Sequence, residues 1–311
     1  MSANPMPQNR IKAIEFFAGI GGFVHSWPDA DVVAAYDISE LCQQVYEQNH
    51  PGLFITKEIA SLSAEELTNW QADVWWMSPP CQPFTSRGNG KDIHDPRCSA
   101  FLHLTGLIPE CLPCQIGLEN VAGFRNSQAM QRLVATLKHS GYTVQYCDFC
   151  PSQLGWPNRR PRFYLLAARA PGALRPWRVV ESQPSHHSRS PRLKELVMDQ
   201  QADYDPEVCL EPEKTEAFEE ALDRVSADDA TAVTACFGSS YGKSILHAGS
   251  YLQTVDGLRR FTPREVAKLM GFPEELDMGS LSTRQQWKVL GNSLSIVAMK
   301  HILTGFRSYS A

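Results

Sequence analysis

The segment Ser78-Pro79-Pro80-Cys81-Gln82-Pro83-Phe84 holds a residue that could form a covalent bond to a substrate. It follows an expected strand at residues 73–77, so Cys81 should lie at the carboxyl edge of a sheet, where α/β proteins bind ligands. The prolines end the strand and stiffen the loop around the thiol. We therefore predict that Cys81 is a nucleophile. The alternative is an inert cysteine after a proline-rich turn.

Two further elements bring charged groups to the same edge. Glu119 ends an expected strand at residues 115–119, and a partly buried glutamate there could donate a proton. Its alternative role is to cap a helix or bind a ribose. Arg160 and Arg162 enter an expected strand at 162–168, where a spacing of two places both side chains on one face. They could bind a base carbonyl, a phosphate or Glu119, or else form a surface cluster.

A glycine-rich turn offers a site for a nucleoside cofactor. Phe16-Phe17-Ala18-Gly19-Ile20-Gly21-Gly22 stands where the first strand turns into the first helix, and bare backbone there can contact a ligand. Asp37 ends the next strand, 18 residues beyond Gly19, where its carboxylate could bind ribose hydroxyls. The turn alone permits NAD, S-adenosylmethionine or a purely structural role as a tight turn. Hydride transfer has no use for Cys81, which counts against NAD.

A thiol, an acid and arginines beside such a cofactor make one specific reaction possible. A thiolate could attack C6 of a cytosine while the ring nitrogen N3 is protonated, which makes C5 nucleophilic. C5 could then take a methyl group from S-adenosylmethionine, after which a base removes the C5 proton and the thiol leaves.

Alternating strands and helices predict the scaffold for these residues. Hydrophobic patterning indicates strands at residues 11–17, 31–37, 53–56, 73–77, 115–119, 143–149 and 162–168. Helices are expected near 101–110 and 127–140. This order predicts an α/β fold with a doubly wound, mostly parallel, Rossmann-like sheet. Prolines after Ala168 mark an irregular segment where a second, smaller domain begins, and helical patterns return at 259–271 and 282–304.

Five motifs in order resemble those of cytosine-C5 methyltransferases: Phe17-Ala18-Gly19, Pro79-Pro80-Cys81-Gln82, Glu119-Asn120-Val121, Arg160-Pro161-Arg162 and Gly291-Asn292-Ser293. Within that superfamily, further segments resemble the tRNA-methylating branch: Phe84-Thr85, Asp95 with Arg97, Phe101-Leu102-His103, Leu154-Gly155, Pro157-Asn158, and Cys236-Phe237 with Tyr241-Gly242. The likeness runs from about Ile11 to Phe306 and is weakest between Arg175 and Thr231.

The resemblance implies a methyltransferase that uses S-adenosylmethionine, releases S-adenosylhomocysteine and modifies the anticodon-loop cytosine at tRNA position 38, chiefly in tRNA-Asp. It implies that Cys81 is the nucleophile and Glu119 the N3 proton donor, with Arg160 and Arg162 binding the base and ordering the loop. The residues that it places around the cofactor are Phe17, Ala18, Gly19, Gly21, Gly22, Asp37, Ile38, Glu58, Ile59, Pro80, Asn292 and Ser293. The expected division is a catalytic domain at 1–178 and 283–311 and a target-recognition domain at 179–282.

Two positions depart from the family patterns. DNA-acting relatives usually have Gln where Asn158 stands, and the tRNA branch usually has Thr where Gly238 stands. The second departure puts the identity of the target in doubt. A DNA cytosine methyltransferase and a tRNA-binding protein with weak catalysis therefore stay open as alternatives.

Charge is segregated along the chain although the net charge is only −5. Residues 151–194 carry nine Lys or Arg and one acid, whereas residues 195–229 carry thirteen acids against Lys214 and Arg224. The basic segment is suited to contact phosphates, and the acidic one should lie away from them. The side chains that we expect to contact RNA are Arg175, Arg178, Phe237, Tyr241 and Lys243.

Cysteine usage and hydropathy predict the protein's environment. Nine cysteines in a chain of 311 residues favour free thiols in a reducing compartment. No apolar stretch approaches the roughly 18 residues of a membrane helix, so we expect a cytoplasmic protein without membrane contact, and a monomer. The pairs Cys111/Cys114 and Cys147/Cys150 lie too far apart along the chain for a usual zinc ribbon, so no metal is expected.

Overall fold

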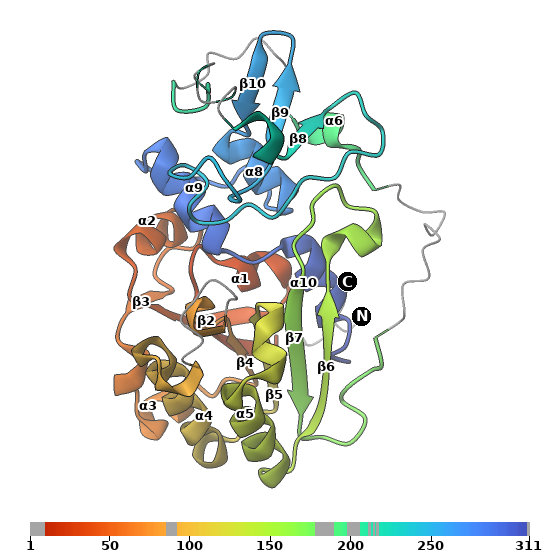
Figure 1. Cartoon of the computed structure of the whole chain (residues 1–311). Coiled ribbons are helices and arrows are strands. Elements are labelled where there is room, and N and C mark those ends of the chain that lie inside the picture. The colour runs from red at the N-terminus through yellow and green to blue at the C-terminus, as the bar shows by residue number, and fades with distance from the viewer. Residues whose placement is uncertain are drawn as a thin grey trace, which may run out of the picture.

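A seven-stranded sheet forms the centre of the protein (Figure 1). The computed structural model describes residues 10–84, 92–177, 190–197, 206–210, 213, 215 and 218–309. The strand order is β3-β2-β1-β4-β5-β7-β6, with four parallel pairs, and β7 runs antiparallel to both neighbours. The strands are β1 Lys12–Phe16, β2 Asp31–Asp37, β3 Phe54–Thr56, β4 Val74–Met77, β5 Gln115–Asn120, β6 Thr143–Phe149 and β7 Arg162–Ala168. The prediction of a mostly parallel α/β sheet is confirmed.

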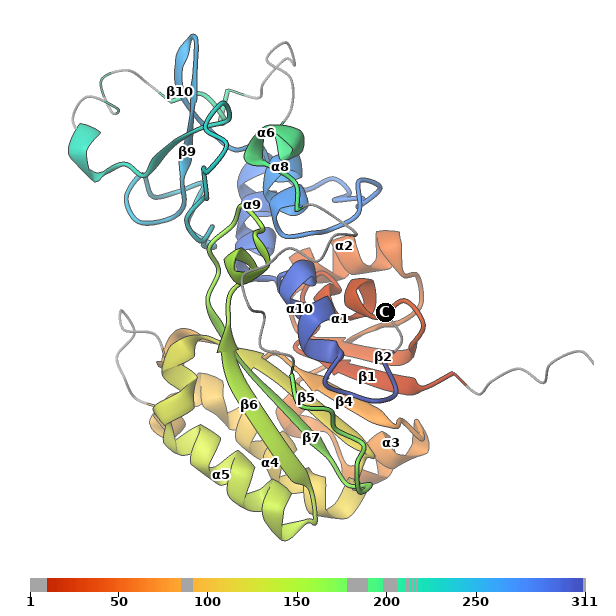
Figure 2. The ribbon, with the colours of Figure 1, turned by 90° about the vertical axis from the view of Figure 1, so that its right-hand side faces the viewer.

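Helices cover both faces of this sheet (Figure 2). One face packs against α3 Ala64–Asn69, α4 Ser99–Cys111 and α5 Gln128–His139, and the other against α1 Gly22–Ser26, α2 Glu40–Asn49 and α10 Ile296–Leu303. Successive side chains of β4 point to opposite faces of the sheet, so this strand contributes to the hydrophobic core on each face. Trp75 packs among residues of α4 and α5, whereas Trp76 packs among residues of α1 and α10. Both neighbouring side chains are therefore buried, which is typical of a strand inside a parallel sheet.

A smaller sheet lies beyond one edge of the large one (Figure 1). Its order is β10-β9-β8, and short helices adjoin it. The elements of this region are α6 Leu193–Leu196, β8 Arg224–Ser226, β9 Tyr251–Thr254, β10 Gly257–Arg260, α8 Pro263–Leu269 and α9 Thr283–Asn292. Buried residues of this region share one core with residues of α2 such as Val45 and Tyr46. The small-sheet region is thus packed against α2 of the large-sheet region.

Two helix predictions in the C-terminal part were wrong in their bounds. The expected helix at 259–271 begins only at Pro263, because Arg259 and Arg260 belong to β10 and pair with β9. The expected helix at 282–304 is two helices, α9 and α10, with a break at Ser293 and Leu294. Ser295 caps the second helix, since its side chain accepts a hydrogen bond from the backbone N–H of Ala298.

The described part of the chain contains no helix long and apolar enough to cross a membrane. All nine cysteines are free. Within the same residues, no group of three or more His, Cys, Asp or Glu side chains is arranged to hold a metal ion.

Candidate active site

The turn between β1 and α1 has an unusual backbone conformation. Phe17, Gly19 and Gly21 have positive φ values of 56°, 55° and 85°. Asp37, at the end of β2, holds the turn by accepting a hydrogen bond from the N–H of Gly19 at 2.9 Å. A side-chain carbon built on Gly19 would meet no atom within 4 Å, and Gly19 lines a cavity. The turn therefore presents open backbone to that cavity.

The loop after β4 holds Cys81 at the same cavity. Its start is fixed by Ser78, which donates its N–H to the carbonyl of Phe16 at 3.2 Å, and by Asn120, which donates to the carbonyl of Pro79 at 3.0 Å. Burial raises the pKa of the Cys81 thiol, and Arg162 opposes this effect. The loop is thus held at its start, and burial favours the neutral form of the thiol while Arg162 favours the thiolate.

Glu119 supplies a buried acid beside the thiol. Glu119 is the second-to-last residue of β5 and is 8% exposed. Burial raises the pKa of Glu119, although the guanidinium groups of Arg162 and Arg160 act to lower it. Arg162 lies close, with Nε 3.2 Å from Glu119 Oε1. A carboxyl group with a raised pKa can hold and donate a proton near neutral pH.

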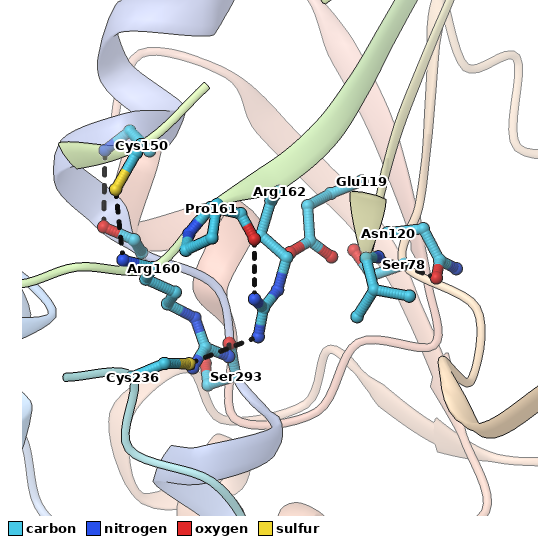
Figure 3. A network of polar contacts seen from close by, with 12 residues as sticks. Ser78, Glu119, Asn120, Cys150, Arg160, Pro161, Arg162, Cys236 and Ser293 are labelled. Carbon is cyan, nitrogen blue, oxygen red and sulfur yellow. Dashed lines mark hydrogen bonds and ion pairs between the residues drawn. The ribbon is translucent and has the colours of Figure 1, made fainter. Parts of the chain in front are cut away.

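The antiparallel direction of β7 explains how two arginines reach this edge. β7 pairs with β5 so that its first residues lie beside the last residues of β5. Arg162 begins the strand and Arg160 precedes it by two residues, and both side chains reach the same cavity. The guanidinium of Arg160 donates to the backbone carbonyls of Phe237 and Gly291, each at 3.1 Å, and also to that of Ser293 (Figure 3). Arg160 therefore ties the small-sheet region to the break between α9 and α10.

These elements enclose a cavity of about 540 Å³. This volume lies within the range of small-molecule sites. The predicted site residues that line it are Phe17, Ala18, Gly19, Asp37, Ile38, Glu58, Ile59, Pro80, Cys81, Glu119, Arg160, Arg162, Asn292 and Ser293.

Two predicted cofactor residues do not line the cavity. A side-chain carbon on Gly21 would crowd Val24 and Tyr46, at 3.0 and 3.2 Å, and one on Gly22 would lie 2.8 Å from Leu294. These two glycines allow close packing behind the turn, so we correct their expected role as cofactor contacts.

Several lining residues were not predicted as site residues. Ser78, Gln82 and Arg97 lie at the cavity. Arg97 forms a two-pronged hydrogen bond with buried Asp95, at 2.8 and 2.6 Å. The sequence contained a signal for Arg97 as a site residue, because Asp95 and Arg97 belong to a motif that resembles the tRNA branch. The motif does not show whether these side chains point into the cavity.

The hydrogen bonding at the start of α1 favours a cofactor without phosphate, because an N–H group there is already used within the protein. Glu15 in β1 is 1% exposed and accepts a hydrogen bond from the N–H of Phe23 at 2.9 Å, in the first turn of α1. A dinucleotide would place its pyrophosphate at such a helix start. Beside Asp37, Ile38 is 63% exposed at the cavity and can cover an apolar ring. These residues fit S-adenosylmethionine better than NAD.

The expected RNA contacts are scattered. Phe237 and Tyr241 are only 2% and 0% exposed, and the Tyr241 hydroxyl donates to the Ser250 carbonyl at 2.6 Å, so we correct the expectation that these rings stack on bases. Lys243 is exposed on the loop that follows them. Arg175 is exposed, and its backbone is hydrogen-bonded to Gly305 and to the side chain of Gln145 in β6. Arg178 lies outside the described residues.

The two positions that depart from the family patterns have different surroundings. Asn158 is buried and donates to Thr234 Oγ1 at 3.0 Å, so it joins the approach to β7 to the small-sheet region. A side-chain carbon on Gly238 would meet only the carbonyl oxygen of Ala248, at 3.8 Å. Packing therefore does not require glycine at position 238.

A Rossmann-like sheet with a cofactor-sized cavity, a thiol and a buried acid at its carboxyl edge defines a methyltransferase, in agreement with solved structures. The EhMeth methyltransferase of Entamoeba histolytica superposes with a TM-score of 0.86 at 26% identity, over 95% of this chain and 97% of that one. The chain belongs to the C-5 cytosine-specific DNA methylase family, whose family model matches residues 11–306.

Two further comparisons involve Schizosaccharomyces pombe. The tRNA (cytosine(38)-C(5))-methyltransferase of this yeast is 30% identical, over 95% of this chain and 96% of its own length. The crystal structure of S. pombe Dnmt2 methyltransferase matches with a TM-score of 0.84 at 30% identity, over 95% of this chain and 98% of that one.

Proposed function

We propose that this protein is an S-adenosylmethionine-dependent tRNA methyltransferase that modifies C5 of cytosine 38 in the anticodon loop, in tRNA-Asp or a related tRNA. The observation that carries the reaction is the meeting of Cys81, Glu119 and Arg162 at one cavity. The choice of tRNA is supported by the yeast relative named tRNA (cytosine(38)-C(5))-methyltransferase, which matches almost the full length of the chain.

In the proposed mechanism, Cys81 and Glu119 act on the pyrimidine ring together. The Cys81 thiolate forms a bond to C6 while the carboxyl group of Glu119 gives its proton to N3, so that an electron pair is left at C5. When bound, S-adenosylmethionine supplies the methyl group. Loss of the C5 proton to a base then expels the Cys81 thiolate, and return of the N3 proton to the Glu119 carboxylate restores the neutral aromatic ring. Without the covalent bond, C5 is too weak a nucleophile to react.

Arg162 acts on both Cys81 and Glu119, the two side chains that react with the base. Its guanidinium favours the Cys81 thiolate, whose formation burial opposes. The same group lies 3.2 Å from Glu119 and stabilises the carboxylate that remains after protonation of N3. Arg162 thus favours the charges that appear as the thiolate attacks.

For the cofactor, we propose that Asp37 binds the ribose hydroxyls and that Ile38 and Ile59 cover the adenine. Glu58, Pro80, Asn292 and Ser293 would complete the walls, and the backbone of residues 17–19 would contact the amino-acid end. Asp37 already accepts three hydrogen bonds, two at Oδ1 and one at Oδ2. Since a carboxylate can accept about four in total, about one acceptor site is left free, at Oδ2.

We propose that the chain consists of a catalytic domain at 1–178 and 283–311 and a target-recognition domain at 179–282. Within the second domain, Lys243 would contact a substrate phosphate near the reacting base. Arg175 would contact a more distant part of a long RNA. One chain carries all the lining residues, so a monomer suffices. The nine free cysteines support a reducing compartment such as the cytoplasm.

Methyl transfer to total tRNA and to duplex DNA tests the choice of substrate. With tritiated S-adenosylmethionine at one salt concentration, we expect a far higher kcat/KM for folded tRNA, because flipping a paired base out of DNA costs a few kcal/mol. The label should map to cytosine 38. Equal or better kcat/KM on duplex DNA would favour the DNA methyltransferase alternative. Tight tRNA binding without transfer would favour the protein with weak catalysis.

A further inference from the structure

One cysteine beside the site has no role in the mechanism described above. Cys236 lies between β8 and β9, and its sulfur contacts both cavity arginines (Figure 3). Arg160 Nη1 donates to Cys236 Sγ at 3.3 Å, and Arg162 Nη2 donates to it at 3.7 Å. Two cationic groups therefore converge on one half-buried thiol.

The surroundings of Cys236 favour its ionised form. Burial alone would raise the pKa of this thiol, but the guanidinium groups of Arg160 and Arg162 outweigh burial, and the pKa of Cys236 lies below its ordinary value. In contrast, burial raises the pKa of Cys81. Of these two thiols at the arginine pair, Cys236 is therefore the one that carries negative charge first as the pH rises.

Arg162 is shared between this sulfur and the catalytic acid. Its Nε lies 3.2 Å from Glu119 Oε1, while its two terminal nitrogens donate to Cys236 and to the carbonyl of Pro161. The Arg162 guanidinium lowers the pKa of Glu119 and so opposes the effect of burial, which favours the proton that the reaction requires. A second anion on the other side of the guanidinium opposes this lowering of the pKa.

We propose that Cys236, as a thiolate, is the counter-ion of Arg160 and Arg162 and so allows Glu119 to keep the proton that it donates to cytosine N3. Cys236 is thus a positioning residue that acts through the arginines. This inference rests on the proposed function, because it assigns Cys236 a part in the same reaction.

The direction of the expected pH effect follows from the groups that face each side chain. Among the described residues, Glu119 is influenced by Arg162, Arg160, Cys81 and Tyr164, and Cys236 by the two arginines. Removal of the thiolate leaves both guanidinium charges to act on Glu119, so its pKa falls. Since activity requires protonated Glu119, the fall of kcat/KM at high pH should then begin at a lower pH.

The charge state of Cys236 can be measured in the wild-type protein without any activity. Alkylation by iodoacetamide, followed at each cysteine by mass spectrometry across a pH series, reports the pH at which each thiolate forms. We expect the midpoint for Cys236 to lie below that of exposed Cys114 in the same chain. A midpoint at or above that of Cys114 would overturn the proposal.

Variants test the link to Glu119. In the Cys236→Ser variant, we expect the pH at which kcat/KM falls on the alkaline side to be lower by about one pH unit. The Cys236→Asp variant restores an anion, so this pH should return toward the wild-type value. The matched control is Cys150→Ser, because the Cys150 sulfur contacts the backbone N–H of Arg160, at 3.2 Å, and its removal should leave this pH unchanged.

The outcomes separate this inference from the proposed function. An active wild type whose Cys236→Ser variant loses rate without any shift of the pH at which kcat/KM falls would contradict the inference alone. A wild type that transfers no methyl group to RNA or DNA would contradict the proposed function, while the alkylation midpoint would still test the charge state of Cys236.

Discussion

At the scale of residues, Asp37 shows how one side chain can shape the backbone and also face a ligand. Its carboxylate accepts hydrogen bonds from the N–H groups of Gly19, Ile38 and Ser39 at 2.9, 2.7 and 2.9 Å. All four residues line the cavity. Asp37 therefore joins the ends of β1 and β2 at the proposed ribose position.

Replacement of Asp37 by alanine should weaken the binding of S-adenosylmethionine by about 1–3 kcal/mol, because charge-assisted hydrogen bonds are lost. Titration calorimetry with the cofactor would measure the change. Asp31→Ala is the matched control, since Asp31 is exposed at the opposite end of the same strand and its loss should leave affinity unchanged. Unaltered affinity in Asp37→Ala would remove this side chain from the cofactor site.

Residue types predicted chemistry better than they predicted exposure. Cys81 and Glu119 could be placed at one edge from the sequence, because each follows a hydrophobic strand whose end is clear. Phe237 and Tyr241 could not be placed in this way. Aromatic rings serve equally well as core residues or as platforms for bases, and only the packing of Tyr241 against Trp287 and Tyr251 decides between these roles.

At the scale of elements, the junction of α9 with the small-sheet region depends on Gly291. A side-chain carbon at this position would lie 2.3 Å from the backbone carbon of Gly238 and 2.3 Å from the backbone nitrogen of Ser239. Both neighbours are backbone atoms, so the segments would have to move apart. The following residue, Asn292, lines the cavity.

We expect Gly291→Ala to lower the free energy of unfolding by about 1–3 kcal/mol, as overpacking usually does, and also to weaken cofactor binding. Gly106→Ala is the matched control. Gly106 lies within α4 and has no atom within 4 Å of the added carbon, so this change should be neutral or stabilise by up to about 1 kcal/mol. Equal melting temperatures for the two variants would show that the junction tolerates a side chain.

The elements that the sequence predicted well are those with strong local patterns. The strands at 31–37, 143–149 and 162–168 have the expected bounds. The error at Arg259 and Arg260 has a tertiary cause, because these residues form a strand only by pairing with β9. The antiparallel direction of β7 could not be predicted from the hydrophobic pattern of its own residues either, because it depends on which strand β7 pairs with.

At the scale of the whole molecule, the cavity draws on segments from far apart in the chain. Cys81 follows β4, Glu119 lies near the end of β5, and Arg162 begins β7. Asn292 ends α9, and Ser293 lies in the break between α9 and α10. Arg160 joins the last of these to the small-sheet region through buried hydrogen bonds. The cavity is therefore complete only when the end of α9 and the break that follows it are packed against the large-sheet region.

Covalent capture on RNA that contains 5-fluorocytosine tests the central claim most directly, because fluorine at C5 cannot leave as a proton does and the thiol stays bound. In the presence of S-adenosylmethionine, wild type and a Cys114→Ala control should form a complex with the RNA that survives denaturation. Cys81→Ala should form none and should transfer no methyl group to ordinary RNA, while it retains its fold and its cofactor affinity. Normal methylation or undiminished capture by Cys81→Ala would contradict the covalent mechanism.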